Sequence, residues 1–140
     1  MSILRNQREK SGRAAEELAA AAGISVQAYY DLETHDDELN MAVSIAGIGS
    51  VARELDVKPS VLYGGSSSRS TSLNELVSIV RKHIEAEGRP VADFEIEIGW
   101  SIEAALSNPE ALRGFNADGL KAVCEAVNVN WFEVLDGLVE

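Results

Sequence analysis

Apolar residues in the first 63 positions recur with the spacing of amphipathic helices. Gly12, Gly23 and the Lys58-Pro59 pair interrupt this spacing where helices would end. The pattern predicts helical segments at Ile3–Lys10, Ala14–Ala22, Ser25–Thr34, about Leu39–Leu55 and Pro59–Tyr63. No segment of this half requires a strand, so we expect an all-helical unit.

The segment GGSSSRSTS, residues 64–72, has the composition of a flexible linker. It divides the chain into parts of similar length, and we therefore predict two small domains, residues 1–63 and 73–140, joined by the linker 64–72. Nine flexible residues span roughly 15 to 18 Å on average and about 30 Å at most. So short a connection favours two domains that pack against each other.

The two halves also resemble each other in sequence. An offset of 76 residues pairs identical residues at nine positions between 2 and 28 without a gap. These pairs include Gly12 with Gly88 and Gly23 with Gly99. Farther along, an offset of 72 residues aligns the apolar positions of residues 48–57 with those of 120–129. The pattern predicts a tandem duplication whose second copy is four residues shorter.

One stretch of the second half carries two patterns at once. Phe94–Ile98 reads FEIEI, and such strict alternation is also typical of a strand. Its alignment with the helix predicted at Ala14–Ala22 favours a helix, and both alternatives remain open at the level of sequence.

The chain carries a net charge of −11 over 140 residues, the opposite of the basic footprint typical of nucleic-acid-binding domains. It has no run of about 18 apolar residues that could span a bilayer, so we expect no membrane partner. The opening MSILRNQREK lacks the apolar stretch of a secretory signal, and Cys124 is the only cysteine. We therefore expect a cytoplasmic protein.

No residue pattern indicates catalysis, a cofactor or a metal site. His35 and His83 lie far apart without the spacing of metal ligands, and no strand-turn-helix context surrounds a serine nucleophile. Cys124 aligns with Ala52, a position expected to be small and buried, so we expect a structural thiol. The protein is predicted not to be an enzyme.

Residues 11–35 meet the requirements of a helix-turn-helix: a small residue where the helices cross, a glycine at the turn and apolar anchors on both helices. The residues in these places are Leu18, Ala19, Gly23, Ile24, Tyr29 and Leu32. With LRNQREKSG, EELAAAAGIS, YYDLE and SVARELDVKPSVLYG, residues 3–64 resemble the Cro and phage-repressor type (XRE) helix-turn-helix family. The second half resembles it more faintly. The expected fold is all-α: two small tandem five-helix domains of the phage-repressor type, the second degenerate, joined by a Gly/Ser linker.

The resemblance implies a DNA-binding surface. The residues that it assigns there are Arg13, Ser25, Val26, Gln27, Tyr30 and Asp31. Ser25 would begin the recognition helix, and Arg13 would lie beside the phosphates. Gln27 suits a bidentate pair with adenine, and Val26 suits contact with a thymine methyl group. These features predict a transcriptional regulator or antitoxin-type repressor that binds operator DNA, and a homodimer is one form that it could take.

Acidic residues depart from that pattern. Asp31 stands where the family often has a polar or basic residue, and Ala15 stands where it commonly has glutamine. A carboxylate about 4 Å from a phosphate costs about 1 kcal/mol even in water. Further carboxylates occur at Asp36, Asp37 and Glu38 and, in the second half, at Asp93, Glu95, Glu97 and Glu103. Residues 66–140 hold 6 Lys and Arg against 13 Asp and Glu, a net of −7, whereas residues 1–65 hold 6 against 10, a net of −4.

These carboxylates support an alternative function of a different class. An immunity protein, antitoxin or anti-regulator would use the same fold to bind and inhibit a basic partner protein such as a toxin, with Asp93, Glu95, Glu97 and Glu103 at the interface. The sequence leaves DNA binding and acidic protein binding as competing hypotheses.

Overall fold

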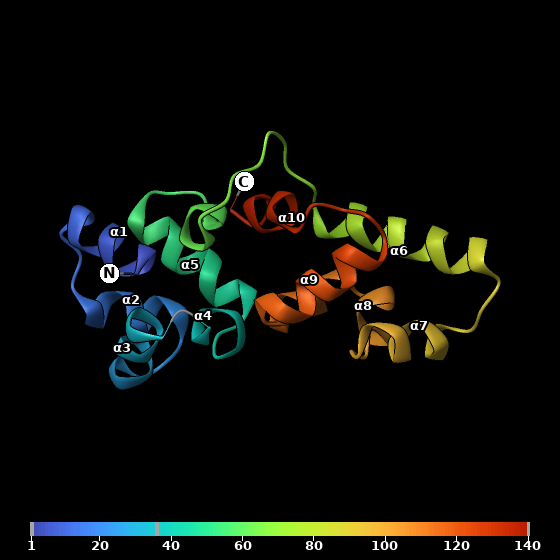
Figure 1. Cartoon of the computed structure of the whole chain (residues 1–140), viewed down its shortest axis with the longest axis horizontal. Helices are drawn as coiled ribbons and strands as arrows, with labels where there is room; N and C mark the ends of the chain where they lie inside the picture. Colours follow the sequence, from blue (N-terminus) through green and yellow to red (C-terminus); the bar gives the residue numbers. More distant parts are fainter. Residues whose placement is uncertain (1, 36, 140) are drawn as a thin grey trace.

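The computed structural model describes residues 2–35 and 37–139 and is built from helices (Figure 1). In the first half these are α1 (Ile3–Ser11), α2 (Ala15–Ala22), α3 (Val26–Thr34), α4 (Glu38–Met41), α5 (Ile45–Leu55) and the 3-10 helix η1 (Pro59–Tyr63). In the second half they are α6 (Leu73–Glu87), α7 (Val91–Ile98), α8 (Glu103–Ser107), η2 (Pro109–Gly114), α9 (Ala117–Ala126) and α10 (Trp131–Gly137). The expected all-α class is confirmed. Among the described residues, no helix is both long enough and apolar enough to cross a membrane.

The helices follow one another in the same order in both halves. An offset of 76 residues places α2 (Ala15–Ala22) on α7 (Val91–Ile98), and an offset of 72 residues places α5 on α9 and η1 on the start of α10. Two helices differ in length between the halves: α6 has 15 residues against 9 in α1, and α8 has 5 against 9 in α3.

The turns repeat with the helices. Gly23 ends α2 at φ 73° and Gly99 ends α7 at φ 77°, in the left-handed conformation that glycine adopts without steric cost. The two non-glycine residues with positive φ in the described chain, Asp56 at 56° and Asn128 at 60°, are also 72 positions apart. Asp and Asn tolerate this conformation better than other side chains.

Two predictions made from periodicity are settled by the structure. The continuous helix expected over about Leu39–Leu55 is wrong, because α4 ends at Met41 and α5 begins at Ile45. Ser44 breaks the run by accepting a hydrogen bond from the Gly47 amide on its hydroxyl, which starts a new helix, while Val43 is buried in the gap. The FEIEI stretch is helical and belongs to α7.

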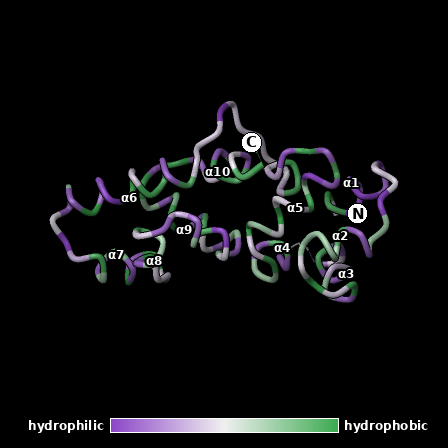
Figure 2. The backbone as a smooth tube through the Cα atoms, turned by 180° about the vertical axis from the view of Figure 1, so that it is seen from behind, coloured by the Kyte–Doolittle hydropathy of each residue, from purple (hydrophilic) through white to green (hydrophobic). Residues whose placement is uncertain are grey.

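Each half has its own apolar core. The first contains buried side chains from α1, α2, α3 and α5, with Leu18, Tyr29 and Ala52 fully enclosed. The second contains buried side chains from α6 to α10, and Ile45 of α5 joins it. Hydrophilic and hydrophobic residues alternate along α6 in Figure 2, as expected of a helix with one buried face.

The two halves meet over several helices. Figure 1 shows α1 and α6 at opposite ends of the molecule and α4, α5, α9 and α10 between them. Contacts join η1 to α10, α4 to α9 and α5 to η2. Residues 64–72 loop over this junction and are tied to it, because Thr71 is buried and its amide donates to the Glu133 carbonyl at 3.0 Å. The segment is therefore anchored at its end, unlike a free tether.

Candidate nucleic-acid interface

The turn between α2 and α3 is held by its backbone and by the first core. The Ile24 amide donates to the Ala19 carbonyl at 3.0 Å across Gly23, which reverses the chain. Leu18 and Ala19 of α2 and Tyr29 and Leu32 of α3 are buried between the helices. Burying these anchors fixes the angle between α2 and α3 and leaves the opposite face of α3 in solvent.

That outer face of α3 carries three of the predicted contact residues. Gln27 and Asp31 are exposed and Tyr30 is 42% exposed, at the i, i+3, i+4 spacing of one helix face. Val26 is half-buried against the first core, which reduces what it can offer a ligand. The Ser25 hydroxyl accepts the Ala28 amide at 3.1 Å and caps the helix. The structure thus places Gln27, Tyr30 and Asp31 on one exposed face of α3, whereas Ser25 serves as the N-cap of the helix.

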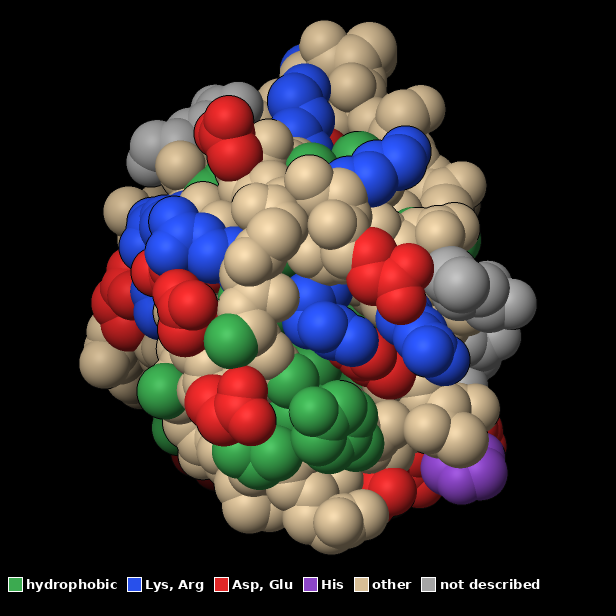
Figure 3. All heavy atoms as spheres, turned by 90° about the vertical axis from the view of Figure 1, so that its left-hand side faces the viewer, with side chains coloured by type: hydrophobic (Ala, Val, Ile, Leu, Met, Phe, Trp, Pro, Cys, Tyr) green, Lys and Arg blue, Asp and Glu red, His purple; other side chains and the backbone are tan. Residues whose placement is uncertain are grey.

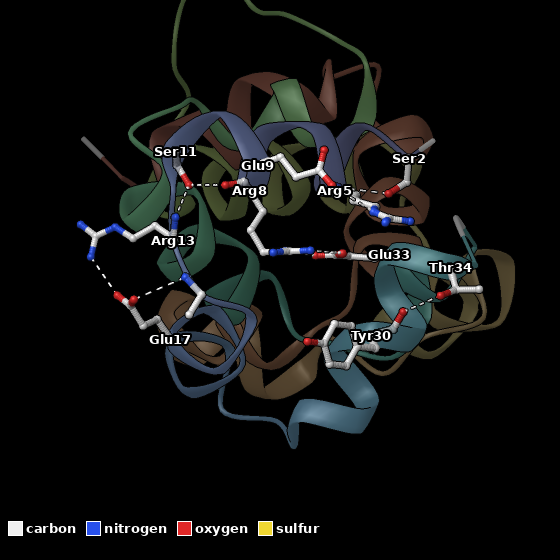
Figure 4. Close-up of polar contacts among 11 residues, drawn as sticks. Ser2, Arg5, Arg8, Glu9, Ser11, Arg13, Glu17, Tyr30, Glu33 and Thr34 are labelled. Atoms are coloured by element: carbon white, nitrogen blue, oxygen red, sulfur yellow. Dashed lines mark hydrogen bonds and ion pairs between the residues drawn. The ribbon is translucent and has the colours of Figure 1, made fainter.

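Arg13 lies on the loop before α2 and forms ion pairs with two carboxylates. Its guanidinium is 3.0 Å from Glu17 (Figure 4). It is also 3.4 Å from Glu54, and the side chains of all three residues are 41 to 50% exposed. The hydrogen bonds from Arg13 and from the Ala14 amide lower the pKa of the Glu17 carboxyl. Because exposed ion pairs contribute little, a phosphate can replace these partners at small cost.

A buried ion pair fastens α1 to α3 behind this face. Arg8 donates from Nε to Glu33 at 2.6 Å and from a terminal nitrogen at 3.1 Å, a bidentate arrangement visible in Figure 4. The Glu33 side chain is only 5% exposed. Burial would raise the pKa of Glu33, but the hydrogen bond from Arg8, the nearby Tyr29 hydroxyl and the charge of Arg8 together hold that pKa below its ordinary value.

Most of the basic side chains of the first half already have an acidic or carbonyl partner within the protein. Of its six Lys and Arg residues, Arg5 pairs with Glu9, Arg8 with Glu33 and Arg13 with Glu17 and Glu54, and Arg53 donates to the Leu138 carbonyl. Lys10 and Lys58 are exposed. In Figure 3, which faces this end of the molecule, basic and acidic side chains are interleaved. The surface is therefore mixed in charge and does not form a continuous basic patch.

The corresponding surface of the second half is acidic. A carboxylate oxygen of Glu95 accepts the Ile102 amide at 2.6 Å and the Glu103 amide at 3.3 Å, so it caps the start of α8. The hydrogen bond from the Ile102 amide, above all, lowers the pKa of Glu95. Glu103 is exposed in the first turn of α8. Two carboxylates thus lie at the helix end where a DNA-reading helix would meet the bases.

Three other acidic residues singled out in the sequence, Asp37, Asp93 and Glu97, lie in solvent, whereas Glu38 is partly buried. Asp93 is exposed in the first turn of α7, and Glu97 pairs with Arg89 at 2.7 Å. Asp37 is exposed before α4, and Asp36 lies outside the described residues. Of the four residues predicted for a protein interface, Asp93, Glu97 and Glu103 are free of the fold's capping contacts, whereas Glu95 is a helix cap.

Other kinds of site find no support in the described chain. Within residues 2–35 and 37–139, no group of three or more His, Cys, Asp or Glu side chains is arranged to hold a metal ion. Burial, followed by the charges of Glu125 and Glu133, raises the pKa of the Cys124 thiol to about 12. The thiol is therefore protonated at neutral pH and unsuited to nucleophilic chemistry.

Sequence reasoning missed two polar contacts that organise the molecule. One is the Arg8–Glu33 pair, and the other is Asp136, a carboxylate only 2% exposed that accepts from the Ser60 amide at 2.9 Å and from its hydroxyl at 2.8 Å. Asp136 lies within the mostly apolar stretch WFEVLDGLV, directly after Val134 and Leu135. An acidic residue in such a stretch is the one sequence signal for a buried carboxylate.

A scan of the chain against protein-family models finds no match, and searches of curated proteins and of solved structures find no significant match.

Proposed function

We propose that the chain is a DNA-binding transcriptional regulator of the helix-turn-helix type, in which α3 reads the major groove. The observation that carries this proposal is the outer face of α3, where Gln27, Tyr30 and Asp31 stand in solvent on a helix held rigidly by its buried side. A major groove admits one α-helix, and recognition helices use residues of their first turns to contact base edges. The likeness of residues 3–64 to the Cro and phage-repressor type supports the same function.

The three side chains of this face suit base recognition. A glutamine such as Gln27 presents an acceptor and a donor that match the N6 and N7 edge of adenine. Asp31 suits a cytosine, since a carboxylate accepts from the N4 amino group, although it opposes nearby phosphates. We therefore expect that Gln27 and Asp31 determine sequence preference.

The phosphate contact comes from Arg13 and the start of α2. Arg13 would exchange its contacts with Glu17 and Glu54 for a phosphate, and it lies at the start of α2, where the helix dipole also favours an anion. Because few other cations are available, we expect moderate affinity with a shallow salt dependence.

The test is selection of bound duplexes from a randomised DNA library, followed by titration of the enriched sequence across about 50 to 200 mM salt. Gln27→Ala should lower affinity for the selected site by about 1 to 3 kcal/mol and relax preference at one base pair. Arg13→Ala should weaken all sequences alike and reduce the salt slope by about 1.

Matched controls distinguish these effects from general damage. Gln7→Ala, on α1, removes the same side chain from another surface, and Arg5→Ala removes an arginine from a comparable exposed ion pair. Both controls should bind like the wild type. If no sequence is enriched even at the lowest salt, the regulator hypothesis is wrong.

One observation favours a second candidate function, the binding of a basic protein. Glu95 and Glu103 place negative charge at the start of α8, with Asp93 and Glu97 on neighbouring α7. Under this hypothesis, the double variant Glu97→Lys and Glu103→Lys should lose a partner that cross-links to the wild-type chain. A control that reverses Glu85 and Glu125, two exposed carboxylates on α6 and α9, should retain it. Equal capture by both double variants would exclude the α7–α8 face.

A further inference from the structure

The junction between the halves brings equivalent positions together. Ser44 and Asn116 are 72 residues apart, each caps the N-terminus of its helix, and they form an antiparallel bridge with each other. The helices η1 and α10, related by the same offset, also contact each other. An antiparallel bridge between equivalent positions is the arrangement that a two-fold axis between two copies produces. Both contacts therefore mark such an axis between the halves.

Two further contacts at the junction form a reciprocal pair. The offset of 72 residues relates α4 to η2 and α5 to α9, and the structure joins α4 to α9 and α5 to η2. Reciprocity of this kind defines a two-fold interface, in which each copy contributes the same patch. Figure 1 shows this arrangement: α1 and α2 lie at one end of the molecule, and their counterparts α6 and α7 lie at the other.

The side chains that close this junction differ between the two copies. Ser60 of the first copy donates its amide and hydroxyl to the buried carboxylate of Asp136. The equivalent of Ser60 in the second copy is Phe132, which lies on Gly65, where a β-carbon would be 2.3 Å from the ring. Ser67, in the connecting loop, donates a third hydrogen bond to Asp136 at 2.5 Å.

This difference favours pairing of unlike halves. Two first halves would bring Ser60 to a surface with no carboxylate, because the position equivalent to Asp136 is Gly64. Two second halves would bring Phe132 onto Asp136 and leave a buried carboxylate without donors, which is strongly unfavourable. Unfavourable alternatives of this kind make an interface specific.

We infer that residues 73–138 occupy, within one chain, the place that a second subunit occupies in a symmetric dimer, so that the protein acts as a monomer with one reading helix and recognises a single DNA half-site. The half-site rests on the proposed function, whereas the pairing of the two halves does not. The second reading position is closed, because α8 has only five residues and Glu95 and Glu103 lie at its start. The DNA target should therefore lack two-fold symmetry.

The deciding experiment joins two measurements on the full chain. Sedimentation equilibrium over a wide concentration range should give the mass of one chain, 15.0 kDa. Hydroxyl-radical footprinting on the selected duplex should show protection on one major-groove face, at one chain per duplex. A mass of two chains, or two equal protections about 10 base pairs apart, would overturn the inference. A monomer that enriches no DNA would refute the proposed function and still support the internal pairing.

A variant then tests whether the hydrogen bonds to Asp136 hold the two halves of the chain together. Asp136→Ala removes the acceptor of three hydrogen bonds, whereas the control Asp118→Ala removes an exposed carboxylate from α9. Limited proteolysis within residues 64–72 should be at least about tenfold faster in Asp136→Ala than in the control. Equal rates would overturn the assigned role of Asp136. If Asp136→Ala does not fold, Ser67→Ala, which removes one of these bonds, should show a smaller acceleration in the same assay.

Discussion

The helix pair α2–α3 and its counterpart α7–α8 share a turn and differ in the helix after that turn. Gly23 and Gly99 adopt nearly the same φ, 73° and 77°, and Leu18 and Phe94 fill equivalent buried positions before them. After the turn, α3 runs for nine residues and α8 for five. The comparison shows that the core and turn of this unit are maintained while its outer surface is free to change.

The starts of the two second helices show the difference most directly. A neutral hydroxyl, that of Ser25, caps α3 from the adjoining residue. A charged carboxylate, that of Glu95, reaches α8 from the preceding helix, where the first half has the small Ala19. The first arrangement leaves the start of the helix open to an incoming anion, whereas the second occupies it with negative charge.

The largest expected effect concerns the ion pair behind α3. Glu33→Gln leaves Arg8, whose side chain is 20% exposed, without a counter-charge, and should lower the free energy of unfolding by about 2 kcal/mol at pH 7. Because the pKa of Glu33 is lowered in the folded state, its contribution is present above its ordinary value of 4.5 and is lost as pH falls. Urea unfolding should therefore show wild type and variant converging in acid. Glu9→Gln, in an exposed pair with Arg5, is the control and should change little.

A smaller effect is expected at the cap of α3. Ser25→Ala removes the acceptor of the Ala28 amide and should destabilise the protein by about 1 kcal/mol. Ser101→Ala, at the equivalent position before α8, should cost less, because Glu95 supplies the cap there. Thermal unfolding of the two variants under identical conditions measures the difference. Equal losses would show that the two helix starts are organised alike.

The smallest effect is expected at Glu95 itself. Glu95→Gln retains an acceptor for the Ile102 amide but loses the charge that favours this position, so the Tm should fall by less than in Ser25→Ala. The lowered pKa of Glu95 means that the charge contributes above its ordinary pKa and is lost on acidification, which should erase the difference in Tm. Glu97→Gln, in an exposed pair with Arg89, provides the reference. A difference that persists in acid would contradict this origin.

The sequence was informative at several places where local chemistry decides structure. The helix start at Ser25, the turns at Gly23 and Gly99, and the placement of α2 and α7 all depend on side chains next to the backbone that they control. The FEIEI stretch remained ambiguous, because the helix that contains it, α7, has only eight residues, too few turns to separate the two periodicities. The break at Ser44 was missed because apolar spacing continues across it.

The amino-acid sequence alone predicted that the chain forms helices and located α1, α2, α3 and η1, because these properties depend on neighbours a few residues apart. Only the tertiary structure decided which charges are available. Arg8 meets Glu33 across 25 positions, and Ser60 meets Asp136 across 76. The physical reason is that burial and pairing of a charge depend on the packing of distant segments, and no local pattern encodes that packing.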